Sequence, residues 1–164
     1  MVFTRIEIKI MKLELKHIIP YLPYDLQVKC YDNVWSVEGF RKGVSLFLMD
    51  DSVLTSADLS DVKPILKPIS SMTKEEAYEL GAILISEADM EDKEIGIGEM
   101  TLMGVAYPTI VYKDKEDEEY SVTIQFSSIG ISGIDLIPYE AYEWFFKHHF
   151  DVFRLINKGL AIEK

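Results

Sequence analysis

The first third of the chain alternates apolar and polar residues, which is the pattern of half-buried β-strands. The alternation predicts strands in residues 3–16, Leu26–Tyr31, Val34–Glu38, Val44–Met49 and Ser52–Thr55. Asp32-Asn33 separates the second of these segments from the third, and both residues tolerate the left-handed conformations that a two-residue hairpin requires. Between the first two segments, Pro20 and Pro23 bracket an apolar stretch that begins at His17. We expect one helical turn there, followed by a bend.

Helical spacing first occurs in the middle of the chain. Two prolines make Ser56–Ser71 an extended connector rather than a helix. Thr73 and Glu76 then form the pattern of a capping box, and apolar residues at helical spacing continue to about Ala88. The acidic, glycine-containing segment Glu87–Glu99 is predicted to be a loop.

The last third of the chain predicts a hairpin followed by helices. Thr101–Tyr112 and Tyr120–Ser127 are expected to pair as strands, with the acidic run between them as the turn. Pro138 suits the first position of a helix that extends to His149. Asp151–Asn157 is expected to form a second helix, capped by its aspartate. Together these patterns predict an α+β fold: a mostly antiparallel sheet with a middle helix and C-terminal helices.

Length and composition are those of one globular domain. The chain has 164 residues, of which 48% are hydrophobic and 27% charged. This mix excludes a disordered or low-complexity chain, and the length is sufficient to bury a core without disulfides or metal ions. We therefore predict a single domain over residues 1–164. Met11 offers a second possible start, which would make residues 1–10 an N-terminal extension.

The net charge of −11 is concentrated in one region. Residues 87–119 include 3 basic and 11 acidic side chains, a net charge of −8, whereas the rest of the chain is nearly balanced. An excess of negative charge disfavours direct binding to nucleic acid or to an anionic membrane surface. Because closely spaced like charges repel, we expect Glu116, Asp117, Glu118 and Glu119 to form an exposed turn.

Three stretches of the chain follow a recurrent order and spacing. They are Leu15–Leu26 (LKHIIPYLPYDL), Val62–Lys74 (VKPILKPISSMTK) and Trp144–Glu163 (WFFKHHFDVFRLINKGLAIE). The pattern resembles that of short, uncharacterised proteins from prophages and mobile elements of gut bacteria. The resemblance implies a single-domain fold and a mobile-element origin, and it implies no activity or catalytic residue. One departure is Arg154, where the pattern leads us to expect a small residue such as glycine.

The cysteine content and the apolar segments indicate a reducing compartment. Cys30 is the only cysteine, so it forms no intrachain disulfide. It lies in a predicted strand without the basic, partly exposed setting of a catalytic thiol, which favours a structural role. The alternating N-terminal residues do not form the apolar stretch of a secretory signal, and the longest charge-free segments are shorter than the about 20 residues of a membrane span. We expect a cytoplasmic protein.

The candidate metal ligands are His148, His149 and Asp151, because zinc and iron favour imidazole and carboxylate groups. Adjacent helical residues point about 100° apart, so only His148 and Asp151 could share a face, and only in a continuous helix. The alternative, which we favour, is that Asp151 caps the next helix and one histidine packs beneath aromatic side chains. The chain has no nucleophile elbow and no phosphate-binding glycine loop. We therefore predict no catalytic residue, no metal site and no cofactor.

These features favour a small, soluble, non-enzymatic accessory protein that acts by binding another protein. The candidate contacts are the acidic run Glu116–Glu119 and Trp35, since aromatic residues are enriched in interfaces. An acidic surface would suit a host or phage partner with a basic surface, including a nucleic-acid-binding protein whose substrate it imitates. The alternatives are a small metal-dependent hydrolase that uses His148, His149 and Asp151, and a self-associating structural component.

Overall fold

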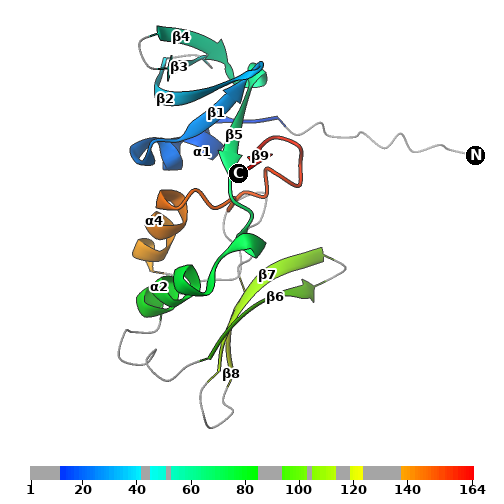
Figure 1. Cartoon of the computed structure of the whole chain (residues 1–164). Helices are drawn as coiled ribbons and strands as arrows, with labels where there is room; N and C mark the ends of the chain where they lie inside the picture. The colour runs from blue at the N-terminus through cyan, green and yellow to red at the C-terminus, as the bar shows by residue number, and fades with distance from the viewer. Residues whose placement is uncertain are drawn as a thin grey trace, which may run out of the picture.

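The computed structural model shows an α+β fold with two sheets (Figure 1). It describes residues 12–41, 45–50, 53–84, 94–102, 105–113, 119–123 and 138–164. The helices are α1 (Leu15–Ile18), α2 (Lys74–Leu84) and α4 (Tyr139–Lys147), with 3-10 turns η1 (Ile19–Tyr24), η2 (Leu59–Asp61) and η3 (Ile69–Ser71). The strands are β1 (Gln27–Cys30), β2 (Asn33–Arg41), β3 (Ser45–Asp50), β4 (Val53–Asp58), β5 (Val62–Leu66), β6 (Glu94–Leu102), β7 (Val105–Lys113), β8 (Glu119–Thr123) and β9 (Ile162–Glu163). The predicted fold class is confirmed.

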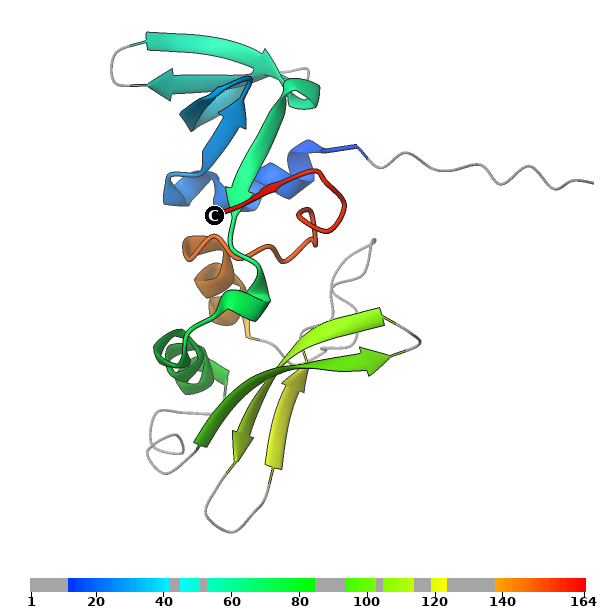
Figure 2. The same cartoon turned by 45° about the vertical axis from the view of Figure 1, so that its right-hand side comes forward.

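The two sheets are built mainly from neighbouring antiparallel strands. The larger sheet has the order β4-β3-β2-β1-β5-β9, in which only the β5–β9 pair is parallel. The smaller sheet has the antiparallel order β6-β7-β8. Figure 2 shows the β1–β4 meander and the smaller sheet at opposite ends of the molecule. Both α2 and α4 lie between them (Figure 1).

Several local predictions are confirmed. Thr73 and Glu76 form the capping box at the start of α2: the Glu76 N–H donates to Thr73 Oγ1 at 3.2 Å, and the Thr73 N–H donates to Glu76 Oε2 at 2.9 Å. The predicted hairpins β1–β2 and β7–β8 form, and the predicted strands β3 and β4 pair with each other. The first turn lies one residue earlier than expected, because Cys30 pairs with Asn33 and leaves Tyr31 and Asp32 as the turn residues. The single strand expected over Thr101–Tyr112 is instead divided between β6, which ends at Leu102, and β7, which begins at Val105.

Four further segments differ from their predictions. Leu15 and Lys16, expected at the end of a strand, begin α1, whereas the helical turn predicted from His17 is present. The expected connector Ser56–Ser71 contains the end of β4 and all of β5. A proline is tolerated in β5 because β9 pairs only with the last two residues of that strand. The expected loop Glu87–Glu99 includes the first half of β6, where pairing with β7 overrides the weak strand preference of glycine.

The fourth difference concerns the C-terminal segment. Asp151–Asn157 forms turns, not the second helix that was expected. The backbone of Arg154 is left-handed, with φ of 56°, which interrupts a right-handed helix.

The predicted strand in residues 3–11 and the predicted helix end near Ala88 lie outside the described residues. In the part of the chain that the structure describes, no helix is both long enough and apolar enough to cross a membrane.

The three segments that carry the resemblance meet in the core, which lies between the larger sheet, η1 and α4. The Tyr21 hydroxyl donates to the Phe150 carbonyl at 2.7 Å. The backbone of Lys67 bonds on both sides: its N–H donates to His149 O, and its carbonyl accepts from the Asp151 N–H, each at 2.8 Å. The buried side chains around these contacts include Leu26, Leu66, Phe145, Phe150 and Leu155. These segments therefore form the structural framework of the protein.

The left-handed backbone of Arg154 explains why glycine would suit that position. A left-handed conformation costs a residue with a Cβ atom about 1–2 kcal/mol, whereas glycine adopts it freely. We expect Arg154→Gly to be more stable than Arg154→Ala by about 1 kcal/mol in urea unfolding. The alanine variant removes the same side chain and keeps the Cβ atom, so the difference isolates the backbone. Equal stability of the two variants would contradict this explanation.

Candidate functional site

The candidate metal ligands lie in the turn after α4, where each has a structural contact. Asp151 is buried, and its carboxylate accepts hydrogen bonds from the Leu155 N–H at 2.8 Å and the Ile156 N–H at 2.7 Å. His148 Nδ1 lies 2.8 Å from the Trp144 carbonyl oxygen. Within the described ranges, no three His, Cys, Asp or Glu side chains come close enough to hold a metal ion. These contacts favour structural roles for the residues.

His149 is held more tightly than His148. Its Nε2 lies 2.6 Å from the carbonyl oxygen of Tyr24. Because a carbonyl only accepts, Nε2 carries the proton. Burial lowers the pKa of His149, and it also lowers the pKa of His17. Burial acts in the opposite direction on Asp151 and raises its pKa.

These pKa shifts predict a loss of stability on mild acidification. The unfolded chain takes up protons at His149 and His17 near pH 6.5, while the folded chain takes them up only at a lower pH. Stability therefore falls as pH decreases from 6.5 through the folded pKa values. Asp151 has the opposite effect, but at lower pH. Its folded pKa is raised above the ordinary value of 3.8, so its contribution to stability increases as the pH falls from the folded pKa towards 3.8. Thermal unfolding at about pH 7.5 and about pH 5.5 should show a lower midpoint at the acidic pH.

A single variant checks the part of this trend that comes from His149. His149→Gln keeps an amide N–H donor at about the reach of the imidazole Nε2, which lies 2.6 Å from the Tyr24 carbonyl oxygen. It does not titrate in this range. Its midpoint should change less with pH than that of the wild-type protein. An unchanged pH dependence would exclude His149 as a source of the effect.

The structure separates the two candidate partner-binding features. Trp35 lies in β2, half-buried and opposite Val28 of β1. Glu119 begins β8 in the other sheet, opposite Lys113. Glu116, Asp117 and Glu118 lie outside the described residues, in the connection from β7 to β8. Trp35 and Glu119 therefore lie in different sheets, and the strands that hold them, β2 and β8, are at opposite ends of the molecule (Figure 1).

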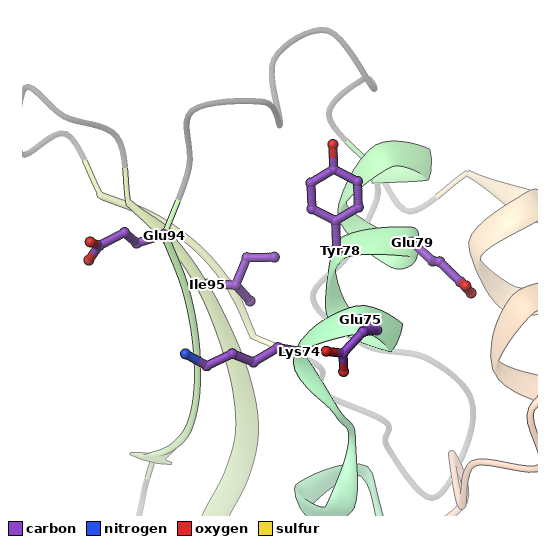
Figure 3. Close-up of a pocket in the computed structure, with 6 residues that line it drawn as sticks. All are labelled: Lys74, Glu75, Tyr78, Glu79, Glu94 and Ile95. Atoms are coloured by element: carbon purple, nitrogen blue, oxygen red, sulfur yellow. The ribbon is translucent and has the colours of Figure 1, made fainter.

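A groove lies between α2 and β6. Its volume is about 720 Å³. The residues that line it are Lys74, Glu75, Tyr78, Glu79, Glu94 and Ile95 (Figure 3). We call it the α2–β6 groove. The sequence pattern shows the polar face of α2, but it does not show that β6 lies opposite this face.

In the α2–β6 groove, Lys74 reaches from α2 towards β6, and Glu94 points away from α2 on the other side of the strand (Figure 3). Figure 3 shows Tyr78 and Ile95 between the helix and the strand. The side chain of Glu79 points towards α4, where its Oε2 accepts a hydrogen bond from Trp144 Nε1 at 3.3 Å. The Glu79 side chain remains 60% exposed despite this contact. The groove thus combines an exposed aromatic ring with an excess of negative charge among the described residues that line it.

The α2–β6 groove lies at the same end of the smaller sheet as the acidic run. Glu94 pairs with Lys113 of β7, which in turn pairs with Glu119 of β8. These three residues form one row across the sheet, and residues 114–118 connect the strands beside it. Residues 87–119, which hold most of the net charge of the chain, therefore include one wall of the groove and the adjoining connection.

The buried cysteine has the properties of a structural residue. Cys30 is 4% exposed. Burial raises the pKa of its thiol, and the nearby charge of Asp61 raises it further. A raised pKa keeps the thiol protonated, whereas a nucleophilic cysteine needs a lowered one.

No protein-family model matches the chain, and no curated protein or solved structure matches it.

Proposed function

We propose that this chain is a small non-enzymatic accessory protein, of prophage or mobile-element origin, that acts by binding another protein with a basic surface. The α2–β6 groove is the observation that supports the proposal best. Its volume of about 720 Å³ is in the range of natural binding sites. Among the described residues that line it, three are glutamates and one is a lysine.

The chemistry of the α2–β6 groove suits lysine and arginine side chains. The Tyr78 side chain is exposed and offers an aromatic face for a cation. Exposed carboxylates attract a basic partner over a distance and speed its association, and salt weakens this attraction. Glu119 of β8 lies in the same row of the smaller sheet as Glu94 and adds to this charge. The proposal thus gives the concentrated charge a function in selecting the partner.

The metal-dependent hydrolase is the weaker candidate. Its three proposed ligands, His148, His149 and Asp151, contact backbone groups that belong to the framework of the fold. A metal ion would compete with these contacts.

A titration with an oligolysine peptide tests the proposed site. The groove variant carries Glu75→Gln, Glu79→Gln and Glu94→Gln, which keep the shape of the groove and remove its charge. Because each exposed ion pair contributes about 0.2–1 kcal/mol, we expect the groove variant to bind the peptide roughly tenfold more weakly. Binding should also weaken as salt increases.

A charge-matched control keeps the test specific. The control variant carries Glu38→Gln, Glu140→Gln and Glu163→Gln, three exposed glutamates outside the groove. It should lose less than about threefold in affinity, because only long-range attraction changes. Equal losses in the groove and control variants would show that the peptide responds to net charge alone and would contradict the assigned site.

A further inference from the structure

A second hollow opens in the β1–β4 meander, far from the α2–β6 groove. Its volume is about 390 Å³. Its lining includes Tyr31 from the first hairpin turn, Trp35 from β2, Thr55 and Asp58 from β4, and Asp61 from η2. Because β3 separates β2 from β4 in the sheet, residues of both strands can line one hollow only where the sheet curls. We call this hollow the Tyr31–Trp35 pocket.

Tyr31 is unusual in its position. It has a left-handed backbone with φ of 55° in a two-residue turn, where glycine or asparagine is normally found. A bulky residue in this conformation is a clear outlier. Its side chain is 79% exposed, so packing in the core does not compensate for the strain. A strained and exposed aromatic residue at the edge of a pocket is consistent with a binding role.

The pocket combines aromatic and anionic groups. Trp35 is half-buried and supplies a second ring. Asp61 and the buried Cys30 both line the pocket. The negative charge of Asp61 raises the pKa of the Cys30 thiol, so the Asp61 carboxylate lies near this buried wall of the pocket. The Asp58 Oδ1 accepts a hydrogen bond from the Ser45 hydroxyl at 3.1 Å. Among the described residues that line the pocket, none is a lysine or an arginine, so its charge is net negative.

We propose that the Tyr31–Trp35 pocket binds the guanidinium group of an arginine side chain on the partner protein. A guanidinium is planar, so it can stack on aromatic rings while its edge donates hydrogen bonds to a carboxylate. The more compact and more strongly hydrated ammonium of lysine gains less from stacking. The pocket therefore selects arginine over lysine. This inference rests on the proposed function only in that the partner is a protein with basic side chains.

The test is an NMR titration of the full-length protein with two capped tripeptides, Gly-Arg-Gly and Gly-Lys-Gly. We expect saturable shifts of the Trp35 indole and Tyr31 signals with the arginine peptide, and at least about threefold weaker binding of the lysine peptide. Free arginine should bind more weakly than the arginine peptide. Absence of saturable shifts at Trp35, or equal binding of both peptides, would overturn the proposal. Binding of free arginine as tight as that of the peptide would overturn the assignment to a protein side chain.

Two new variants and the groove variant complete the test. Tyr31→Gly removes the ring and relieves the backbone, so the protein should fold and bind the arginine peptide about threefold more weakly. Asp61→Asn should also weaken binding. The groove variant should bind the arginine peptide like the wild-type protein, which makes failure of this pocket distinguishable from failure of the α2–β6 groove. Unchanged binding by Tyr31→Gly would overturn the proposal.

Discussion

Replacement of Asp151 by alanine is expected to lower the free energy of unfolding by about 3 kcal/mol, because it leaves two buried N–H groups without an acceptor. The carboxylate is 5% exposed and accepts from the backbone N–H groups of Leu155 and Ile156. Each buried donor that loses its partner costs about 1–3 kcal/mol. Burial raises the pKa of Asp151, and the two backbone hydrogen bonds act in the opposite direction because they stabilise the charged carboxylate. Urea unfolding measures the loss.

Two further variants separate the hydrogen bonds from the charge of Asp151. Asp151→Asn keeps one acceptor oxygen and should lose less than the alanine variant. Asp50→Ala, at an exposed position in β3, should stay within about 0.5 kcal/mol of the wild-type protein. Wild-type stability of Asp151→Ala would contradict the structural role of this carboxylate. Stabilisation of the wild-type protein by added zinc, absent in the alanine variant, would point to a metal site instead.

Replacement of Phe150 by alanine is expected to lower the free energy of unfolding by about 3–5 kcal/mol, as for other large side chains in cores. The Phe150 side chain is fully buried. Its ring stacks on Trp144 at 5.5 Å between centroids and meets Phe145 edge to face at 6.0 Å. The Lys67 ammonium lies 4.7 Å from the ring centroid. Thermal or urea unfolding measures the effect.

A leucine variant at the same position tests the cause of the loss. Phe150→Leu fills most of the space and should cost less than alanine, while it still removes the aromatic contacts. Tyr139→Ala, whose side chain is 70% exposed, should be close to neutral. Equal losses for leucine and alanine would show that ring contacts, rather than volume, dominate at this position.

The features that depend on nearby residues could be predicted from the sequence. The capping box of Thr73 and Glu76 joins residues three positions apart, and the hairpins join strands that are adjacent in the chain. The parallel pair β5–β9 joins Ile65 to Ile162, and no local pattern indicates such a pairing. The capping role of Asp151 was predicted, but the N–H groups that donate to it lie four and five residues ahead, which supports a turn rather than a helix.

The candidate site could be predicted only in part. Trp35 was selected for its residue type, and the structure places it in a pocket. Tyr31 was not selected, because the hairpin turn was expected one residue later, where no left-handed tyrosine would occur. The α2–β6 groove requires a strand in a segment whose glycines and acidic residues indicated a loop. Non-local strand pairing therefore decides where these surfaces form.

The residues that form the structural framework differ from those that line the two proposed binding surfaces. The three segments that carry the resemblance supply the backbone contacts around Lys67, His149 and Asp151. The α2–β6 groove and the Tyr31–Trp35 pocket are lined almost entirely by residues between those segments. Changes in these intervening regions could therefore alter the partner without altering the core.

The central claim is that the chain binds a basic protein through the α2–β6 groove. The most direct measurement is capture from a lysate of the source organism on the immobilised wild-type protein, the groove variant and the control variant, at about 50 mM and about 300 mM salt. We expect the immobilised wild-type protein and the control variant to retain the same defined protein from the lysate at low salt. The groove variant should lose this protein, and high salt should release it. Retention of the same proteins by all three would contradict the claim.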